Sequence, residues 1–528
     1  MPMDSPGVAI IGGGPSGLAV AKHLLEVGLR PIIFEQSASI GGQWNASAPH
    51  SGVWKSMRTN TSHVTTCFSD LPHQPGTAMF PTNQEILAYL RRYAAQFDLQ
   101  NRVLLNTRVD SIAPADNGRW TVRSSSGGRS AQTETFSRVV VASGRYTRPF
   151  IPEFRGLNVF KSTGGVSHAF DYDGPEPFHS RRVLVVGNSI SALEIAADLA
   201  SDPTITVISG CRKPRYIFSK ILAGLPADLV VFNRFASLLG RALPPAAVGE
   251  GLKKLVLRYC GNPTQYGGLR PTENIFEANV SLCQDYLPLV AEGRIRPKLE
   301  PERFTEDSAI FADGSREAID DVIFGTGYAL NLPFLGEENC RLLGVDDAGL
   351  DLYQHTFHPD LPGLAFVGLY KQLGPYLPVV ELQGRWVAAA WSGARALPDR
   401  ATMLAAIDAS RGMRKARPEV VCHDMALLFA SAAGVAPDIA RRPRLARALV
   451  FGPLAPAQFR LDGPGSRPDA EPRFAEAAAA FGRDNSPDLT LEERGELEML
   501  APKLKDEPWL KELLGTLPPI STSAAAQR

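Results

Sequence analysis

The chain has 528 residues, too many for one ordinary hydrophobic core, so its length predicts two to four domains. Its 55 basic and 55 acidic side chains balance, which excludes a global positive field for nucleic acid and leaves small molecules as the expected partners. The start lacks a basic segment followed by an apolar one, and no stretch reaches the roughly 18 apolar residues of a spanning helix. We therefore expect a soluble cytoplasmic protein without an integral membrane segment.

The first predicted unit is a strand, a glycine turn, a helix and a second strand over residues 8–35. The turn reads G-x-G-x-x-G: Gly12 permits the tight turn, Gly14 lets a pyrophosphate approach, and Gly17 lets helix and strand pack closely. The helix N-terminus supplies N–H donors and a positive dipole, and Glu35 ends the second strand, where it can accept from ribose hydroxyls. The unit predicts nucleotide binding, against the alternative of an ordinary tight turn.

Further along, two β-hairpin turns are predicted at residues 117–118 and 313–314. Two apolar strands, at 139–141 and 322–324, run into small residues and are expected to lead into crossings between two domains. The stretch from about 216 to 284 combines an amphipathic helical run, expected to cover a substrate tunnel, with a Pro- and Gly-rich part. It is interpreted as an insertion near the substrate entrance.

A second strand–turn–helix–strand unit spans residues 182–208, with Ser189 and Ala192 replacing two glycines of its turn. Arg212 and Lys213 follow its last strand, where an acid would stand for NADH. A guanidinium there can hold a 2′-phosphate, so NADPH is predicted, and a solvated basic pair is the alternative.

The C-terminal hundred residues are Ala-rich and helical, and residues 521–528 are predicted to be disordered. The six cysteines are scattered, without C-x-x-C pairs or metal-ligand spacing. We expect buried, reduced thiols and no bound metal.

Several ordered motifs carry a family resemblance between residue 8 and about residue 465. They are Gly41-Gly42-Gln43-Trp44, residues 56–61, Ser162 to Tyr172, Gly325-Thr326-Gly327-Tyr328, residues 381–386, and residues 451–465. The series resembles the class B flavin-containing monooxygenases. The fingerprint F-x-G-x-x-x-H-x-x-x-Y is met at Gly164, His168 and Tyr172, but Ser162 stands at its aromatic position. Animal members end in an apolar anchor, whereas residues 503–528 are polar.

The resemblance implies an α/β fold with two Rossmann-like dinucleotide-binding domains, one for FAD and one for NADPH, with a mostly helical insertion and a C-terminal extension. The expected parts are the FAD-binding domain at 1–165 and 318–420, the NADPH-binding domain at 166–317 with its insertion, and a helical extension at 421–528. Whether the protein forms a homodimer stays an open question at this point.

The resemblance also implies the site residues. Those expected at the cofactors are Gly12, Gly13, Gly14, Pro15, Ser16, Gly17, Glu35, Gln36, Gly42, Gln43, Trp44, Thr59, Asn60, Thr61, Val109, Ser143, Gly144, Gly187, Asn188, Ser189, Ser191, Ala192, Arg212, Gly327, Tyr328 and Gln383. Asn60 is the predicted catalytic donor beside the flavin, and His168 is assigned a structural role.

By similarity to the family, NADPH reduces FAD, and oxygen adds to give a C4a-hydroperoxide that oxygenates an amine nitrogen or a sulfide sulfur. Baeyer–Villiger oxidation of ketones is the nearest alternative, although His168 is followed by Tyr172-Asp173 rather than the usual H-x-x-x-[W/F]-P. A disulfide reductase would need a redox cysteine pair. A non-enzymatic redox sensor stays open because binding motifs do not prove turnover.

Overall fold

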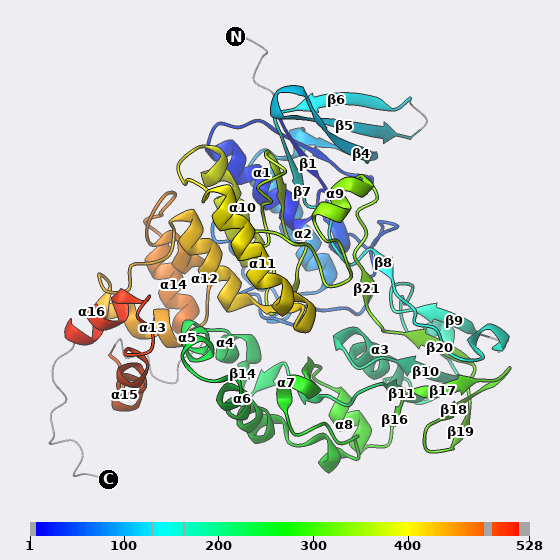
Figure 1. Ribbon diagram of the computed structural model, residues 1–528. Coiled ribbons are helices and arrows are strands. Elements are labelled where there is room, and N and C mark those ends of the chain that lie inside the picture. The colour runs from blue at the N-terminus through cyan, green and yellow to red at the C-terminus, as the bar shows by residue number, and fades with distance from the viewer. Residues whose placement is uncertain (1–6, 128–129, 162–163, 480–487, 517–528) are drawn as a thin grey trace, which may run out of the picture.

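The computed structural model describes residues 7–127, 130–161, 164–479 and 488–516. Within them the chain forms two lobes, each built on a five-stranded parallel sheet (Figure 1). Ser162 of the fingerprint and the terminal stretch 521–528 lie outside the described residues.

The first lobe contains residues from both halves of the chain. Its sheet has the order β22 (Leu364–Phe366), β7 (Arg138–Val141), β1 (Val8–Ile11), β2 (Pro31–Phe34) and β3 (Val103–Leu104). Alternate residues of β1 point to opposite faces. Val8 and Ile10 pack with the helices, whereas Ala9 and Ile11 pack with the antiparallel strands. The helices on the first face are α1 (Pro15–Glu26), α2 (Asn83–Gln96) and α10 (Leu377–Trp391).

An antiparallel sheet covers the other face of the first lobe. It consists of β4 (Thr107–Ala115), β5 (Arg119–Ser126) and β6 (Gln132–Phe136). The turn predicted at residues 117–118 joins β4 to β5, and both Asn117 and Gly118 have positive φ, of 59° and 68°. The loop has three residues, 116–118, between the paired Ala115 and Arg119, and its Asn-Gly pair adopts the positive φ angles that these residues favour, so the predicted hairpin is confirmed.

The second lobe is formed by one continuous part of the chain. Its sheet has the order β16 (Ile295–Leu299), β11 (Thr206–Cys211), β10 (Arg182–Val186), β20 (Asp321–Phe324) and β9 (Gly165–His168). On one face lie α3 (Ile190–Ala200) and α8 (Tyr286–Ala291), and on the other β17 (Pro301–Phe304), β18 (Ser308–Phe311) and β19 (Arg316–Ala318). The hairpin predicted at residues 313–314 joins β18 to β19.

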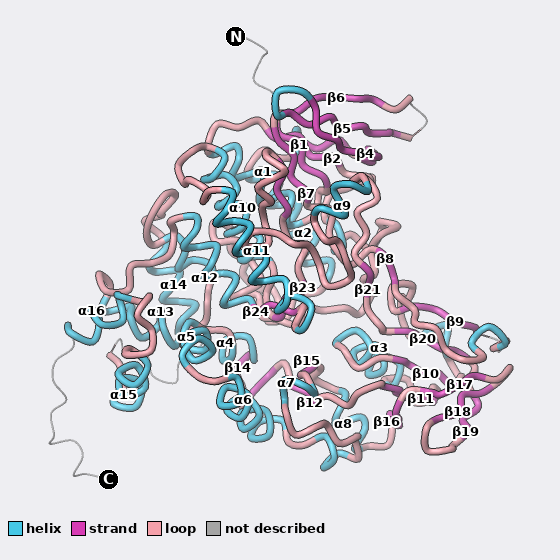
Figure 2. The backbone as a smooth tube through the Cα atoms, viewed as in Figure 1, coloured by secondary structure: helices cyan, strands magenta, loops and turns pink. Residues whose placement is uncertain are grey.

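The expected boundary after residue 317 is wrong by several residues. β20 pairs in parallel with β10 and β9, so residues 321–324 belong to the second lobe, and the return to the first lobe begins after Phe324. The two crossings lie side by side, because β8 (Arg148–Pro149) pairs antiparallel with β21 (Tyr328–Ala329). Figure 2 shows this short ribbon between the two lobes.

The insertion and the C-terminal extension pack on each other. The predicted amphipathic run is two helices, α4 (Ala227–Val231) and α5 (Arg234–Ala242), because Asn233 accepts a hydrogen bond from the N–H of Ala236 and caps α5. They are followed by α6 (Pro245–Cys260) and α7 (Ile275–Ala278). The strands of the insertion are β12 (Tyr216–Phe218), β13 (Ile221–Leu222), β14 (Leu225–Pro226) and β15 (Val280–Leu282).

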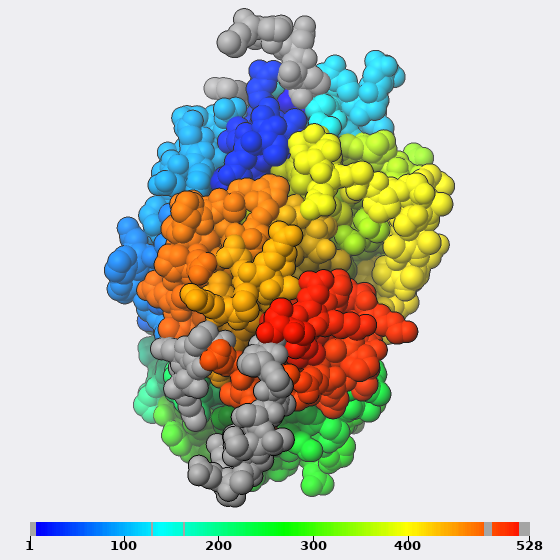
Figure 3. Space-filling model, turned by 90° about the vertical axis from the view of Figure 1, so that its left-hand side faces the viewer, coloured from blue at the N-terminus to red at the C-terminus, as the bar shows by residue number. Residues whose placement is uncertain are grey.

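The remaining helices are α9 (Glu337–Leu342), α11 (Arg400–Ala416), α12 (Cys422–Ala433), α13 (Ala446–Phe451), α14 (Ala470–Ala479), α15 (Leu491–Leu500) and α16 (Pro508–Thr516). Those from α12 onward confirm the expected helical extension, which forms a surface layer between the first lobe and the insertion (Figure 3). Within the described ranges, no helix has the length and apolar character that crossing a membrane requires.

Candidate functional site

The first glycine turn has the geometry that close approach of a phosphate requires. Gly12 has φ 110°, and a Cβ there would lie 2.5 Å from the carbonyl oxygen of Ala142. A Cβ at Gly17 would lie 1.9 Å from the carbonyl oxygen of Gly12, so only glycine lets α1 pack this tightly. Gly14 precedes α1 as its N-cap and makes no side-chain cap, which leaves the first N–H groups of the helix available.

Gly42 faces Gly14 across the same cradle. A Cβ on Gly42 would come within 2.9 Å of the Gly14 Cα, and a Cβ on Gly14 within 3.4 Å of the Gly42 Cα. A side chain at either position would therefore fill the space between the turn and the short helix at Gly42–Trp44. Gln43 and Trp44 belong to that short helix, and Trp44 packs partly against the first core.

Glu35 is buried and fixed by two backbone donors. Its Oε2 accepts from the N–H of Gly13 at 2.8 Å, and its Oε1 accepts from the N–H of Ser37 at 2.8 Å. Each carboxylate oxygen keeps a lone pair, so the geometry fits additional ribose hydroxyls. Gln36 instead points its amide toward Nδ1 of His50, at 3.1 Å.

The second turn tolerates its missing glycine for a visible reason. Ala192 packs against Gly325, where an added Cβ would lie 2.7 Å from the Ala192 Cβ. The close approach is thus made possible by a glycine after strand β20, at Gly325, instead of a glycine in the helix at Ala192. Gly187 keeps φ 137°, and Ser189 and Ser191 lie at the start of α3, where Ser189 is the N-cap without a side-chain hydrogen bond. Asn188 donates to the carbonyl of Lys213 at 3.2 Å.

Arg212 directly follows β11 and is exposed. In the part of the chain that the structure describes, its guanidinium makes no hydrogen bond and no ion pair. Burial raises the pKa of Glu300, and the nearby positive charge of Arg212 opposes this rise. Arg215 is different, since it donates to Oγ of Ser281 at 3.3 Å and burial lowers its pKa. Arg212 is therefore the better placed cation for an added phosphate.

Three buried oxygens in the predicted site have no hydrogen-bond partner among the described residues. They are Oδ1 of Asn60, Oγ1 of Thr59 and Oγ of Ser143. An unpaired buried polar atom costs about 1–3 kcal/mol, so these atoms fit a bound molecule that supplies partners. The hydroxyl of Thr61 lies instead 2.6 Å from that of Thr66. Gly144 and Gly327, at the ends of the two crossing strands, have φ 77° and 91°.

The fingerprint residues make their contacts within the second lobe and with the crossing that follows β20. A Cβ at Gly164 would lie 1.5 Å from Oδ1 of Asp321, so the position requires glycine. His168 donates from Nε2 to the carbonyl of Gly327 at 3.0 Å, and its Nδ1 accepts from the N–H of Phe170. Burial lowers the His168 pKa, and this neutral ring matches the structural role assigned to it. Tyr172 donates to Asp198 at 2.6 Å.

Tyr328 connects this histidine to aromatic residues that no local motif marks. Its ring lies edge-on to His168, at 5.1 Å between centroids, and to Tyr146, at 5.6 Å. The hydroxyls of Tyr146 and Tyr376 are 2.9 Å apart. Sequence reasoning missed this tyrosine pair because it joins positions 230 residues apart.

Gln383 has a different role from the one expected. Its amide nitrogen donates to the carbonyls of His355 and Phe366 and to Oγ1 of Thr356, and its oxygen accepts from the N–H of Gly368. Because the side chain is buried and its polar atoms are used within the protein, we withdraw it as a cofactor ligand. Val109 belongs to β4 and its side chain is buried in the core, so only its backbone could contact a cofactor.

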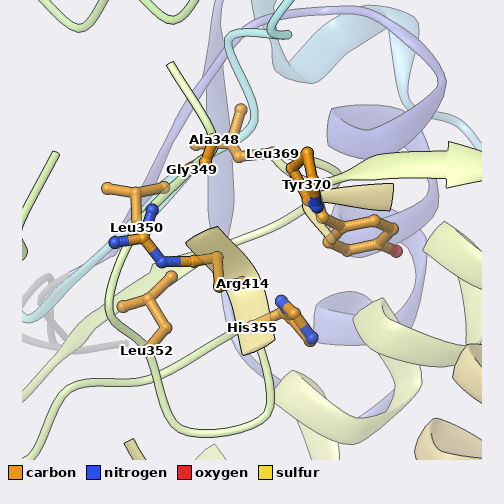
Figure 4. A pocket seen from close by; sticks show the side chains of 9 residues that line it. Ala348, Gly349, Leu350, Leu352, His355, Leu369, Tyr370 and Arg414 are labelled. Carbon is orange, nitrogen blue, oxygen red and sulfur yellow. The ribbon is translucent and has the colours of Figure 1, made fainter. Parts of the chain in front are cut away.

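Two small pockets lie beside these loops rather than in them. One is lined by Leu350, Leu352, His355, Leu369, Tyr370 and Arg414, and burial lowers the pKa of His355 to about 4 (Figure 4). The other brings together Thr65 of the segment after Asn60, Phe232 of the insertion and Cys422 of α12. Neither of the two includes a glycine of the predicted turns.

The six cysteines are free thiols, and five of them are buried as expected, whereas Cys340 is half-buried. Among the described residues, no group of histidine, cysteine and acidic side chains forms a metal-binding cluster.

The chain matches a family model described as flavin-binding monooxygenase-like over residues 6–475. It is 32% identical over 489 residues to human flavin-containing monooxygenase 5, covering 88% of this chain and 90% of that protein. It is 34% identical over 485 residues to dimethylaniline monooxygenase (N-oxide-forming) 2 of Oryctolagus cuniculus, covering 87% and 89%.

Among solved structures, the S-allyl-L-cysteine S-oxygenase of Allium sativum matches with a TM-score of 0.57 and 24% identity, covering 97% of both chains. An open crystal structure of cyclohexanone monooxygenase matches with a TM-score of 0.59 and 17% identity, covering 81% of this chain and 98% of that one. These two likenesses confirm the fold.

Proposed function

This chain belongs to the flavin-binding monooxygenase-like family, and from that premise we propose that it is an NADPH- and FAD-dependent enzyme that oxygenates amine nitrogens or sulfide sulfurs. Flavin-dependent monooxygenase activity is common to the relatives it matches over most of their length. The choice of FAD, of NADPH and of substrate is our proposal. A flavin held between Gly14, Gly42 and Glu35 would supply the redox and oxygen-activating chemistry.

The observation that carries the proposal is the Oδ1 of Asn60, a buried acceptor without a donor in the described chain. It belongs to the segment that resembles the family's flavin-side asparagine. An amide can accept from the cofactor through its oxygen and donate through its nitrogen. A fixed donor of this kind, in a site closed to water, protects a reactive oxygen species from collapse.

The two dinucleotides are assigned by the residues at the ends of the strands. FAD is assigned to the first lobe, where Gly14 and Gly42 leave a cradle and Glu35 is held for a ribose. NADPH is assigned to the second lobe, where the guanidinium of Arg212 suits a 2′-phosphate. His168 takes no proton in this scheme, because both of its ring nitrogens are used in hydrogen bonds with backbone groups of Gly327 and Phe170.

Nitrogen or sulfur oxygenation is favoured over ketone oxidation by the named activities of the relatives. One relative, 34% identical, is named for N-oxide formation, and a sulfide sulfur is a soft nucleophile like an amine nitrogen. The likeness to cyclohexanone monooxygenase, at 17% identity, reflects the shared fold. A ketone therefore serves as the comparison substrate in the test.

The test is turnover of the purified, FAD-loaded protein with NADPH, oxygen and one of three substrates: dimethylaniline, methyl phenyl sulfide or cyclohexanone. We expect an N-oxide or a sulfoxide, formed one for one with NADPH consumed. Lactone formation in preference to both would reassign the enzyme to Baeyer–Villiger chemistry. An absence of NADPH-dependent oxygen uptake in fully loaded protein would reject the proposal. Gly14→Val is the matched control, since its side chain fills the cradle and should prevent flavin binding.

A further inference from the structure

Asp228 in α4 is a buried carboxylate held entirely by neutral donors. It is 3% exposed. Its Oδ1 accepts from the N–H of Ser62 at 3.0 Å, and its Oδ2 accepts from the hydroxyls of Ser62 and Thr65, each at 2.6 Å. None of the arginines and lysines in the described ranges forms an ion pair with it. Burial raises the pKa of Asp228, while these three hydrogen bonds oppose the rise.

The donors of these hydrogen bonds belong to the turn that directly follows Asn60. Within it, the N–H of Thr66 donates to the carbonyl of Ser62 at 2.9 Å, and the hydroxyls of Thr61 and Thr66 meet at 2.6 Å. The Ser62 N–H is the first donor of this turn, so Asp228 caps it from outside. A displacement of Ser62 would move Asn60, two residues earlier.

Asp228 comes from the insertion, 166 residues further along the chain than Ser62. The same region contributes Phe232 to a small pocket that Thr65 also lines. The turn after Asn60 is thus held by an element that is separate from the sheet of the first lobe. Burying a carboxylate without a cation is costly, and the gain here is a fixed backbone position.

We propose that Asp228 is a positioning residue, which sets the place of the Asn60 amide at the flavin by fixing Ser62 and Thr65. The inference rests on the proposed function, because Asn60 must lie at the cofactor for its position to matter. It adds that the insertion holds in place the donor that protects the activated oxygen.

The test compares Asp228→Asn with the unmodified enzyme. The amide has the same size but replaces one acceptor oxygen by a donor group. The hydrogen bonds from Ser62 and Thr65 are therefore weakened, and the fold is kept. We expect full flavin content, an altered flavin absorption spectrum, and hydrogen peroxide per NADPH increased about threefold or more, because small misplacements of positioned groups are costly. The NADPH oxidation rate should change less than the yield of oxygenated product.

The matched control is Asp424→Asn. Asp424 of α12 also accepts a short hydrogen bond, 2.6 Å, from a serine of the insertion, Ser237 in α5, but it does not contact the turn after Asn60. We expect its coupling and spectrum to equal those of the unmodified enzyme. If both variants uncoupled equally, or if Asp228→Asn stayed fully coupled with an unchanged spectrum, the positioning role would be overturned.

A milder variant decides the matter if Asp228→Asn loses flavin. Thr65→Val removes one of the three donors and leaves the carboxylate paired with Ser62. It should raise peroxide in the same direction, and unchanged coupling would contradict the proposal. The flavin spectrum is recorded without turnover, so it tests the positioning role of Asp228 separately from the proposed oxygenation reaction. A spectral change in Asp228→Asn, with no oxygenation by the unmodified enzyme, would support the positioning role and reject the proposed reaction.

Discussion

At the scale of single residues, the Asn60 amide is the group whose loss should separate oxygenation from simple NADPH oxidation. Asn60→Leu keeps the volume but removes both the buried acceptor and the donor. One preorganised donor is worth about 3–4 kcal/mol of stabilisation, enough for peroxide to be released before substrate reacts. We expect a flavin-loaded variant that consumes NADPH, forms hydrogen peroxide and makes almost no oxygenated product.

Asn101→Leu is the control for this variant, since the same chemical change there affects only an exposed contact with Asp98. It should behave as the unmodified enzyme does. Tightly coupled product formation by Asn60→Leu would remove the proposed role. Loss of flavin would show instead that Asn60 shapes the turn.

Arg212 should distinguish the two nicotinamide cofactors. A charge-assisted contact is worth about 1.5–3 kcal/mol, so Arg212→Ala should raise the Kd for NADPH roughly tenfold to a hundredfold and leave that for NADH unchanged. Titration of flavin-loaded protein with each cofactor measures both values. Lys213→Ala is the neighbouring control, and equal weakening of NADPH and NADH by Arg212→Ala would assign the phosphate to another cation.

The sequence predicts the geometry of the first glycine turn well, because the residues that form it are close together in the chain. Gly12, Gly17 and Glu35 lie as the motif requires. Gln383 does not, since its motif gives the residue type but not the direction of the side chain. Asp228 and the Tyr146–Tyr376 pair depend on contacts between distant segments, for which one sequence carries no local signal.

At the scale of elements, a buried ion cluster fixes the C-terminal extension to the first lobe. Arg460, in the short helix Pro456–Arg460, donates to Asp70 at 2.8 Å, to Glu381 of α10 at 3.0 Å and to Oγ of Ser69 at 2.6 Å. Lys22 of α1 also pairs with Asp70. The cluster therefore joins α1, α10 and the extension within one low-dielectric site.

Removing Arg460 should consequently be severe. Arg460→Met leaves two buried carboxylates short of a partner, which typically costs about 3–5 kcal/mol. We expect flavin release at a clearly lower temperature than in the unmodified protein, followed by flavin fluorescence. Arg467→Met is the control, because Arg467 and Asp469 form an exposed pair worth less than about 1 kcal/mol. Equal melting of the two variants would contradict the structural weight given to the cluster.

The helical run of the insertion shows what periodicity can predict. It predicts an apolar face correctly, but not the use of the polar one. Arg234 is buried and donates to the carbonyl of Leu449 at 3.3 Å, and Arg241 pairs with Asp506 and Glu507. These partners lie more than 200 residues further along the chain, so the polar face packs against the extension. The expected role as a tunnel cover stays a prediction.

At the scale of the whole molecule, buried neutral histidines should make the protein sensitive to mild acid. Burial lowers the pKa of His73, His168, His355, His358 and His423. The unfolded chain therefore binds protons more readily than the folded one below pH 6.5, and stability falls as the pH decreases. For His355, the loss continues until its folded pKa of about 4 is reached.

The contribution of His355 can be measured by replacing it with asparagine, which does not titrate and tolerates the positive φ of 55° found there. The unmodified protein should lose unfolding free energy when the pH is lowered from 7.5 to 5.5. In His355→Asn this loss should be smaller by about 1 kcal/mol. An undiminished difference in His355→Asn would contradict this assignment.

The unequal continuity of the two sheets has a consequence for biosynthesis. The second sheet uses residues 165–324 only, whereas the first needs strands from residues 8–141 and its last strand at Leu364–Phe366. A nascent chain of 360 residues thus contains the whole second sheet but lacks β22 and α10, which cover β7 and α1. We expect the middle of the chain to fold on the ribosome before its beginning does. In a stalled chain of this length, protease resistance should appear first in residues 165–324.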